Sequence, residues 1–388
     1  MASLNPELSP SEDYWIWLPK DLWCLILNKL FLVDLIRIGA VCKQWRALLL
    51  DHKKNLNQWP MLLVPTKSGD QQYCKLYNVF YHTMYDCRLP LPYTQRCCGS
   101  SHGWLVRAEQ DLSITLINPF SGKTISLPPV TEVYSGYRDG EAIFVPDFHI
   151  RKVILSDDPS QNPNNYVVVT IYSDIPRVAF IRSGDQSWTY VGEKKPIKDI
   201  YFYKGQLYAL DGYNSLLKIN TDNNIISSSS SSDSRYEIVV PRCLNFCHKP
   251  YLVESSNGDL LMVQRHHWKR KGSVHLDVTV GFKVYKLMMH PSGEEGETEW
   301  VRIDGLGDDA LFLGDNHTIR IVASDIPNCQ PDSIYYTDDY CDRFHHLPYE
   351  ARDMGVFNFK GGSIERHYIL DASHQYMPPA VWIMHKLM

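Results

Sequence analysis

Residues 103–118 read GWLVRAEQDLSITLIN, and residues 205–220 read GQLYALDGYNSLLKIN. In both segments a Gly turn precedes an apolar run, a polar turn follows, and a second apolar run ends at Asn118 or Asn220. Apolar runs joined by turn residues predict β-hairpins. Asn suits a strand exit because it tolerates left-handed backbone and hydrogen-bonds within its own turn. The equal spacing predicts a repeated unit, with chance similarity between hairpins as the alternative.

A weaker third copy lies near the C-terminus. In residues 357–364, Asn358 precedes a Lys-Gly-Gly turn, as Asn118 precedes Ser-Gly-Lys. From about Trp59 onward, runs with a period of two continue, among them QWPMLLVP, RKVILS, YVVVTIY, SLLKIN, YLVES, DLLMVQR, HLDVTVGFKVYKL, TIRIVAS and SIYYTDD. On the order of two dozen strands exceed a simple sandwich and fit five or six four-stranded blades of a β-propeller.

The first part of the chain follows a helical period instead. Leu22, Leu25, Ile26 and Leu30 recur at helical spacing after Pro19, a residue suited to the first helical turn. The runs LIRIGAVC and KQWRALLLDHKK predict two further short helices. The expected fold class is therefore mainly β, with a three-helix N-terminal module followed by a β-propeller-like domain.

The three helices carry a spaced motif. Residues 18–22 read LPKDL, Asp34-Leu35 follow an apolar helix, and residues 41–46 read VCKQWR. This pattern resembles an F-box, whose family motif is LPxDL, an apolar helix, DL and VCKxWR. So small a module cannot bury all its apolar surface, and the surplus is expected to form an interface. The resemblance implies binding to a Skp-type adaptor and, through it, to a cullin and a RING protein.

The same resemblance assigns roles to single residues. Adaptor contacts are expected for Leu18, Pro19, Leu22, Ile26, Leu30, Leu35, Val41 and Cys42. Trp45 is expected to wedge the three helices together as part of the F-box core, with Arg46 at the rim. The alternative is that these helices only cap the β domain.

The β domain has a resemblance of its own. Residues 333–340 (SIYYTDDY), 353–365 (DMGVFNFKGGSIE) and 377–388 (MPPAVWIMHKLM) are similar to the C-terminal signature of plant F-box proteins with a propeller-like domain of the DUF295 type, also described as kelch-like. A plant origin follows from this resemblance. The family pattern Trp-Ile-x-Pro is broken at His385, which leaves the closure of the last strand open.

These two resemblances divide the chain into three expected segments. Residues 1–14 form a flexible N-terminus, residues 15–56 the F-box, and residues 57–388 a substrate-recognition domain. Ser227 to Ser232 form a serine run that is expected to be a flexible loop between blade strands.

Composition narrows the classes of partner. A formal net charge of -5 provides no global basic field, so nucleic acid is disfavoured as the main ligand. The N-terminus lacks the pattern of a signal peptide, and no stretch approaches the roughly 20 apolar residues that span a bilayer. We therefore expect no membrane association and a location in the nucleus or cytoplasm. Reduced cysteines and an unused glycosylation sequon at residues 316–318 follow from that expectation.

No spacing in the sequence indicates a catalytic site, a cofactor site or a metal site. SGKT at 121–124 lacks the first Gly and the following helix of a phosphate-binding loop. Cys243, Cys247 and His248 lack a second ligand pair for zinc, and Cys97-Cys98 has no metal-ligand spacing. Acidic doublets lie at residues 157–158, 308–309 and 338–339. Adjacent strand residues point to opposite faces, so turn roles are favoured over paired glycosidase carboxylates.

The most basic segment is a weak candidate for target binding. It comprises His266, His267, Trp268, Lys269, Arg270 and Lys271. Its place between two strand patterns predicts a hairpin loop, in which the indole could stack on a base or cover an acidic peptide. A solvated loop is the alternative.

Three functions remain at this point. The first is a non-catalytic substrate-recognition subunit of an SCF cullin-RING ubiquitin ligase, which holds a target protein for ubiquitination and proteasomal degradation. The second is an F-box interaction protein that acts outside the ligase. The third is a propeller-fold hydrolase whose helical module only locates it, since blade loops converge at the channel where active sites form.

Overall fold

The structure is a computed structural model that describes residues 18–27, 30, 32–52, 59–68, 71–87, 96–119, 121–131, 137–138, 141–142, 149–173, 175–192, 196–222, 235–241, 249–269, 277–289, 298–338, 353–367 and 379–384. The chain forms two compact units. The first is Met1–Gln58 with Leu387–Met388, and the second is Trp59–Lys386. Each unit has its own hydrophobic core.

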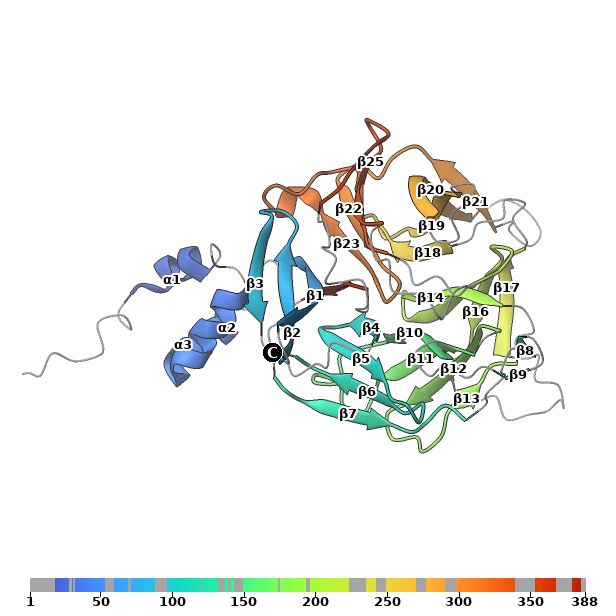
Figure 1. Cartoon of the computed structure of the whole chain (residues 1–388), viewed down its shortest axis with the longest axis horizontal. Coiled ribbons are helices and arrows are strands. Elements are labelled where there is room, and N and C mark those ends of the chain that lie inside the picture. The colour runs from blue at the N-terminus through green and yellow to red at the C-terminus, as the bar shows by residue number, and fades with distance from the viewer. Residues whose placement is uncertain are drawn as a thin grey trace, which may run out of the picture. The chain divides into compact units, whose positions relative to one another are not determined.

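The first unit, called the head below, contains three helices: α1 (Lys20–Leu27), α2 (Leu32–Val41) and α3 (Lys43–His52) (Figure 1). Helix α1 begins directly after Pro19, whose carbonyl accepts hydrogen bonds from the amides of Leu22 and Trp23 at 3.0 and 3.2 Å. Helix α2 begins before the predicted start at Leu35, so Asp34 lies inside its first turn. A carboxylate there is favoured by the helix dipole.

The second unit is a six-bladed β-propeller, which confirms the predicted fold class and fixes the blade number at the upper of the two expected values (Figure 1). Blade 1 contains β27 (Val381–Met384), β1 (Pro60–Ser68), β2 (Gln71–Asn78) and β3 (Thr83–Cys87). Blade 2 contains β4 (Cys97–Ser101), β5 (Trp104–Ala108), β6 (Ile114–Ile117) and β7 (Thr124–Leu127). Blade 3 contains β10 (Ile150–Leu155), β11 (Val167–Tyr172), β12 (Arg177–Arg182) and β13 (Thr189–Tyr190).

Blade 4 contains β14 (Ile197–Tyr203), β15 (Gln206–Asp211), β16 (Leu216–Ile219) and β17 (Tyr236–Val240). Blade 5 contains β18 (Lys249–Glu254), β19 (Leu260–Lys269), β20 (Asp277–Met289) and β21 (Thr298–Ile303). Blade 6 has the spatial order β23 (Thr318–Val322), β22 (Asp309–Leu313), β24 (Ser333–Tyr336), β25 (Gly355–Asn358) and β26 (Ser363–Glu365). A separate short pair, β8 (Tyr137–Arg138) and β9 (Glu141–Ala142), lies between blades 2 and 3 in sequence.

The last strand closes the ring. Strand β27 pairs antiparallel with β1, with Leu62 opposite Trp382. The indole of Trp382 is fully buried, donates through Nε1 to the carbonyl of Leu313 at 3.1 Å, and meets Phe312 edge to face with ring centroids 5.0 Å apart. The sequence did not decide whether the last strand closes the propeller. Strand β27 does so by pairing with β1, and Trp382 at its centre joins it to blade 6.

Blade 6 departs from the simple meander of the other blades. The chain enters it at β22, turns inward to β23, and then crosses to the other side of β22, where β24 pairs with β22 in parallel. The crossover includes a short 3-10 helix at Ala323–Asp325. Phe312 and Tyr335 lie opposite each other on this parallel pair with stacked rings 4.5 Å apart.

The sequence echo corresponds to equivalent places in the blades. Residues 103–118 form the β5–β6 hairpin of blade 2, and residues 205–220 form the β15–β16 hairpin of blade 4. The third copy, residues 357–364, forms the β25–β26 turn of blade 6, which corresponds to the β6–β7 turn of blade 2. The Asn118 side chain accepts from the amide of Ser121 at 3.0 Å, and that of Asn358 accepts from the amide of Gly361 at 3.2 Å. The Asn at each strand exit thus builds the turn that the sequence predicted for it.

The apolar core lies between neighbouring blades. Strand β11 shows the principle, since alternate residues pack in opposite directions. Val168 joins a cluster with Val106 of blade 2, while Val169 joins a cluster with Ala209 of blade 4. Equivalent clusters fill the spaces between blades 4 and 5, 5 and 6, and 6 and 1. A strand with apolar residues on both faces is fully covered in this fold.

Candidate functional sites

The head has a small core of its own. Trp23, Leu27, Leu35 and Leu49 are buried together, and Trp45 packs against them. The rings of Trp23 and Trp45 meet edge to face with centroids 5.1 Å apart. Such aromatic pairs add about 0.5–1.5 kcal/mol beyond the area they bury.

Polar contacts fasten the three helices to one another. Lys20 Nζ lies 2.6 Å from Asp51 Oδ2, so α1 is linked to α3, and hydrogen bonding to that carboxylate raises the pKa of Lys20. Arg46 Nε donates to the carbonyl of Gly39 at 2.9 Å, which links α3 to α2. The amide of Trp45 donates to Cys42 Sγ at 3.4 Å. These contacts hold the three helices against one another within the head.

Helix α1 has a second apolar face that this core does not use. Leu22 is 47% exposed, Leu25 58% and Ile26 39%. They recur at i, i+3 and i+4, so they lie on one side of the helix, whereas Trp23 and Leu27 point to the core. A short helix that is apolar on both sides is typical of a helix buried in a larger assembly.

The other residues predicted to bind an adaptor are distributed around this core. Val41, at the end of α2, is 62% exposed, and Pro19 is exposed. Leu18, Leu30 and Cys42 are half-buried. Leu35 is one of the four buried core residues. Leu25 was absent from the predicted set, although its i+3 spacing from Leu22 was a signal that could have found it.

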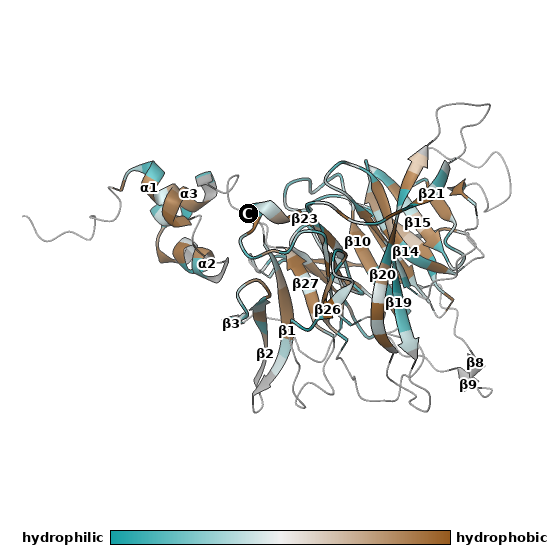
Figure 2. Ribbon diagram, turned by 90° about the horizontal axis from the view of Figure 1, so that it is seen from above, coloured by the Kyte–Doolittle hydropathy of each residue, from teal (hydrophilic) through white to brown (hydrophobic). Residues whose placement is uncertain are grey.

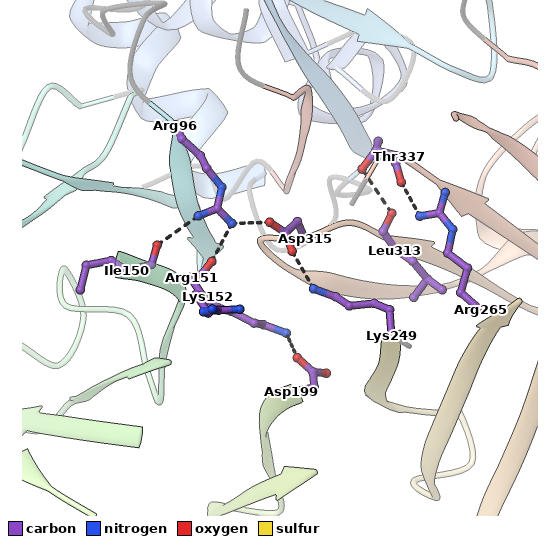
Figure 3. Close-up of polar contacts among 10 residues, drawn as sticks. All are labelled: Arg96, Ile150, Arg151, Lys152, Asp199, Lys249, Arg265, Leu313, Asp315 and Thr337. Atoms are coloured by element: carbon purple, nitrogen blue, oxygen red, sulfur yellow. Dashed lines mark hydrogen bonds and ion pairs between the residues drawn. The ribbon is translucent and has the colours of Figure 1, made fainter. Parts of the chain in front are cut away.

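The centre of the propeller gathers charged side chains that no local motif predicted. Charged side chains at or near the beginnings of the innermost strands β4, β10, β14 and β18, and in the β22–β23 turn, lie close together (Figure 3), and we call this end of the propeller the start face. Arg96, just before β4, donates to the carbonyls of Ile150 at 3.0 Å and Arg151 at 2.7 Å. It also pairs with Asp315, in the β22–β23 turn.

Asp315 is the junction of this network. Its second oxygen lies 2.6 Å from Lys249 Nζ at the beginning of β18. Burial alone would raise the pKa of the Asp315 carboxyl, but Lys249 and Arg96 more than offset it and lower the pKa to about 2. One carboxylate therefore links blades 2, 5 and 6.

A second buried pair spans blades 3 to 5. Lys152 of β10 pairs with Asp199 of β14, and the other oxygen of Asp199 accepts from the amide of Leu252 on β18 at 2.7 Å. Nearby, burial together with Lys152 and His102 lowers the pKa of His317 to about 3. Each of these charges has a partner from a different blade, so the network stabilises the arrangement of the ring.

The acidic doublets serve turns and blade contacts. Asp158 accepts from the Trp104 indole at 3.0 Å and from the Ser160 amide at 2.9 Å. Asp309 accepts from the amide of Ser256 at 2.8 Å, and Asp308 accepts from the Ser324 hydroxyl at 2.6 Å. Asp339 of the third doublet lies outside the described residues.

Neither a metal-binding cluster nor a membrane-spanning helix occurs in the described ranges. No group of three or more His, Cys, Asp or Glu in those ranges is placed to hold a metal ion. Within the same ranges, no helix is both long and apolar enough to cross a bilayer. Cys243, Cys247 and His248 lie outside the described residues, as does the serine run at 227–232.

The basic segment is not the hairpin loop that the sequence predicted. Strand β19 continues through His266, His267 and Trp268 to Lys269, which pairs with Asp277 of β20. The prediction ended the strand at Arg265 because polar residues replace the apolar alternation there. Pairing with β20 continues the strand, and Thr279 of β20, directly opposite His267, is buried. Arg270 and Lys271 lie outside the described residues.

Comparison with known proteins agrees with this architecture. A model described as KIB1-4 beta-propeller matches residues 76–358, and a model described as F-box domain matches residues 15–57. The chain is thus an F-box protein with a β-propeller. It belongs to the KIB1-4 β-propeller family.

Relatives of similar length occur in Arabidopsis thaliana. The F-box protein SKIP23 is 25% identical over 95% of this chain and 95% of its own length. F-box protein At4g35733 is 27% identical over 95% of this chain and 98% of its own length.

Solved structures are more distant. A protein from Lactobacillus plantarum has a TM-score of 0.38 at 9% identity, covering 85% of this chain and all of its own. The Cps50 (Swd1) β-propeller domain from Myceliophteria thermophila has a TM-score of 0.35 at 8% identity, covering 79% and 89%.

Proposed function

We propose that this chain is a substrate-recognition subunit of an SCF cullin-RING ubiquitin ligase. The head binds a Skp-type adaptor and the propeller holds a target protein for ubiquitination and degradation. The observation that carries the proposal is the second apolar face of α1, formed by Leu22, Leu25 and Ile26. The match to an F-box domain and the Arabidopsis F-box relatives support it.

The adaptor surface follows from exposure in the head. Leu22, Leu25, Ile26 and Val41 are the contacts with most apolar area to lose, and burying each side chain contributes roughly 1.5–3 kcal/mol before association costs. Leu18, Pro19, Leu30 and Cys42 complete the surface at its margins. Leu35 acts from beneath by holding α2 against the core.

Adaptor binding is tested by co-expression with a plant Skp-type adaptor. The full chain is expected to co-purify with the adaptor, and the double change Leu22→Asp with Ile26→Asp is expected to abolish co-purification because two carboxylates would have to be buried. Gln44→Asp, at an exposed position of α3, is the matched control. Equal co-purification of the double variant and the control would refute the proposed surface.

Ligase activity needs a separate measurement. An F-box protein that acts outside the ligase would bind the adaptor without promoting ubiquitination. Reconstitution with adaptor, cullin, RING protein and conjugating enzyme is expected to yield ubiquitin transfer to a bound target, and stable adaptor binding without any transfer would favour the alternative. The network at the propeller centre is occupied by structural pairs, so we propose no hydrolase activity.

Three finer expectations belong to the same proposal. The assignment to the DUF295 type, and its kelch-like description, stay predictions. The segment limits at residues 14 and 56 do so as well. Action in the nucleus or cytoplasm follows from the proposed ligase, and imaging of a fluorescent fusion in plant cells tests it.

A further inference from the structure

Strands β19 and β20 project from the start face as a two-stranded ribbon. Lys249, at the beginning of β18, pairs with Arg265, and β19 continues beyond this pair to Lys269. At about 3.3 Å per residue, residues 266–269 add roughly 13 Å to the strand. Strands β19 and β20 reach the lower side of the propeller in Figure 2.

One face of the ribbon is anchored to blade 6. Arg265 is fully buried, and its guanidinium donates to the Thr279 hydroxyl and the Thr337 carbonyl, both at 2.7 Å. It also pairs with Asp353 at 2.8 Å and lies over the ring of Tyr336 at 4.6 Å. The ribbon is therefore held in one position before any partner arrives.

The opposite face of the ribbon is apolar and exposed. Trp268 is 57% exposed and lies directly opposite Val278, which is 42% exposed. A bulge between His266 and His267 follows, and beside it Val280 is 57% exposed. Met262 lies six residues before Trp268 on β19, so the two side chains are on the same face of the strand. Met262 packs in the cluster between blades 4 and 5, so this face is the one directed toward blade 4.

Cations border the apolar residues on that face. Lys283 lies two residues before Tyr285 on β20, and Arg302 of β21 lies directly opposite Tyr285. Both therefore lie on the same face as Tyr285, which packs toward blade 4. Arg302 is largely exposed and forms a long ion pair in which its Nε lies 3.9 Å from Asp304 Oδ1. Burial, followed by the charges of Lys283 and Arg302, lowers the pKa of His266. Two cationic side chains therefore lie beside His266, although the chain as a whole has a formal net charge of -5.

We propose that this ribbon surface, formed by His266, Trp268, Val278, Val280, Lys283 and Arg302, holds the target protein, and that it takes a segment with carboxylates beside a bulky apolar side chain. The inference rests on the proposed role of the propeller as the recognition domain. A rigid, exposed Trp with aliphatic neighbours is suited to anchor such a side chain, and the cations suit the carboxylates.

A nucleic acid fits the surface less well. Single strands are bound by several aromatic side chains along a continuous basic groove. Here one Trp is flanked by two valines, and the net charge is -5. The same surface composition therefore favours an acidic peptide.

The test is selection of a random displayed peptide library on the full-length wild-type protein. Recovered peptides are expected to combine Asp or Glu with Leu, Ile, Phe or Trp. Binding of a synthesised consensus peptide, followed by fluorescence anisotropy, is expected to weaken about 10-fold or more with Trp268→Ala. Lys283→Glu with Arg302→Glu should weaken it comparably, and added salt should weaken wild-type binding.

Matched controls lie at turns on the opposite side of the propeller. Tyr81→Ala removes an exposed aromatic ring at the β2–β3 turn, and Lys123→Glu reverses an exposed charge at the β6–β7 turn. Both are expected to leave peptide affinity within about 2-fold of wild type. Val280→Ser replaces Trp268→Ala if circular dichroism shows that the latter is misfolded.

Several outcomes would overturn the inference. These are recovery of no peptide above background, recovery of peptides without acidic residues, equal effects of Trp268→Ala and Tyr81→Ala, or tighter binding of an oligouridylate. A dimer in light scattering that Trp268→Ala dissociates would assign the surface to a second copy instead. Adaptor co-purification, measured for every variant, reports on the proposed function independently.

Discussion

Helix α1 and strand β11 both carry apolar residues on two opposite faces. Alternate residues of β11 are covered by blades 2 and 4, so the strand exposes no apolar face. Trp23 and Leu27 of α1 are covered in the same way, but Leu22 and Leu25 are not. The propeller completes its core by closing a ring, whereas the head has no second layer. One chain therefore holds a finished core, covered on both faces of its strands, and an unfinished core, which leaves one apolar face of α1 exposed.

The largest expected effect comes from opening the finished core. Trp382→Ala removes the fully buried indole that joins β27 to blade 6, and substitutions of this kind cost about 3–5 kcal/mol. Thermal unfolding is expected to show the propeller transition at a much lower temperature. Adaptor co-purification at low temperature is expected to persist, and its loss would break the independence of the two units that the comparison assumes.

Charge at the propeller centre should matter nearly as much. Asp315→Asn leaves Arg96 and Lys249 without their shared carboxylate, at a cost of about 3 kcal/mol. The pKa of Asp315 is about 2 in the folded chain, against an ordinary value of 3.8. Its contribution is therefore complete above pH 4 and is lost as the pH falls toward 2.

Urea unfolding at several pH values checks this assignment. Stability of the wild type is expected to fall over that acidic window, and the difference from Asp315→Asn is expected to shrink with it. A difference that stays constant down to pH 2 would show that the ion pairs are not the cause.

A smaller effect is expected from the repeated turns. Asn118→Ala and Asn358→Ala each remove a side-chain hydrogen bond to a turn amide, which is worth about 1 kcal/mol, and Asn358→Ala also removes the hydrogen bond that Asn358 Nδ2 donates to Ser333 Oγ at 3.0 Å. Both should therefore lower the midpoint of unfolding. An unchanged midpoint in either variant would show that its Asn does not stabilise the turn.

The smallest effect is expected on the unfinished core. Leu25→Gln changes a 58% exposed side chain, so the free energy of unfolding of the free chain should change by less than about 0.5 kcal/mol. The same change should weaken adaptor binding in a pull-down titration. A large loss of stability in the free chain would mean that this face is already covered.

The sequence predicted well those features that arise from local periodicity. The hairpins at 103–118 and 205–220 and the helix after Pro19 depend on neighbouring residues, so alternation and spacing were enough. The crossover in blade 6 was not predictable, because nothing near Ser333 states that its strand pairs in parallel with β22. Contacts between segments that are far apart in the sequence form only when the chain has closed into the ring.

The candidate sites show the same division. The spaced F-box motif located the head, and helical parity could have added Leu25. Arg96, Lys249 and Asp315 were missed because each is a single polar residue at a strand start, and only ring closure brings them together. The sequence predicts a loop at residues 266–269 because their polar run lacks apolar alternation, whereas backbone pairing with β20 keeps them in a strand.

Pairing between the first and last strands of the propeller has a consequence for synthesis of the chain. Strand β1 is translated ahead of β2 to β26, whereas its partner β27 (Val381–Met384) is translated after them. Until then the edge of β1 that β27 will cover offers its hydrogen-bonding groups to other chains. The core of the head, formed by Trp23, Leu27, Leu35 and Leu49, is translated before any propeller strand, so it can form and bind the proposed adaptor while the propeller is still open. Truncation before Val381, or slow translation of the segment that precedes it, should therefore yield chains that engage the proposed adaptor and yet aggregate through blade 1.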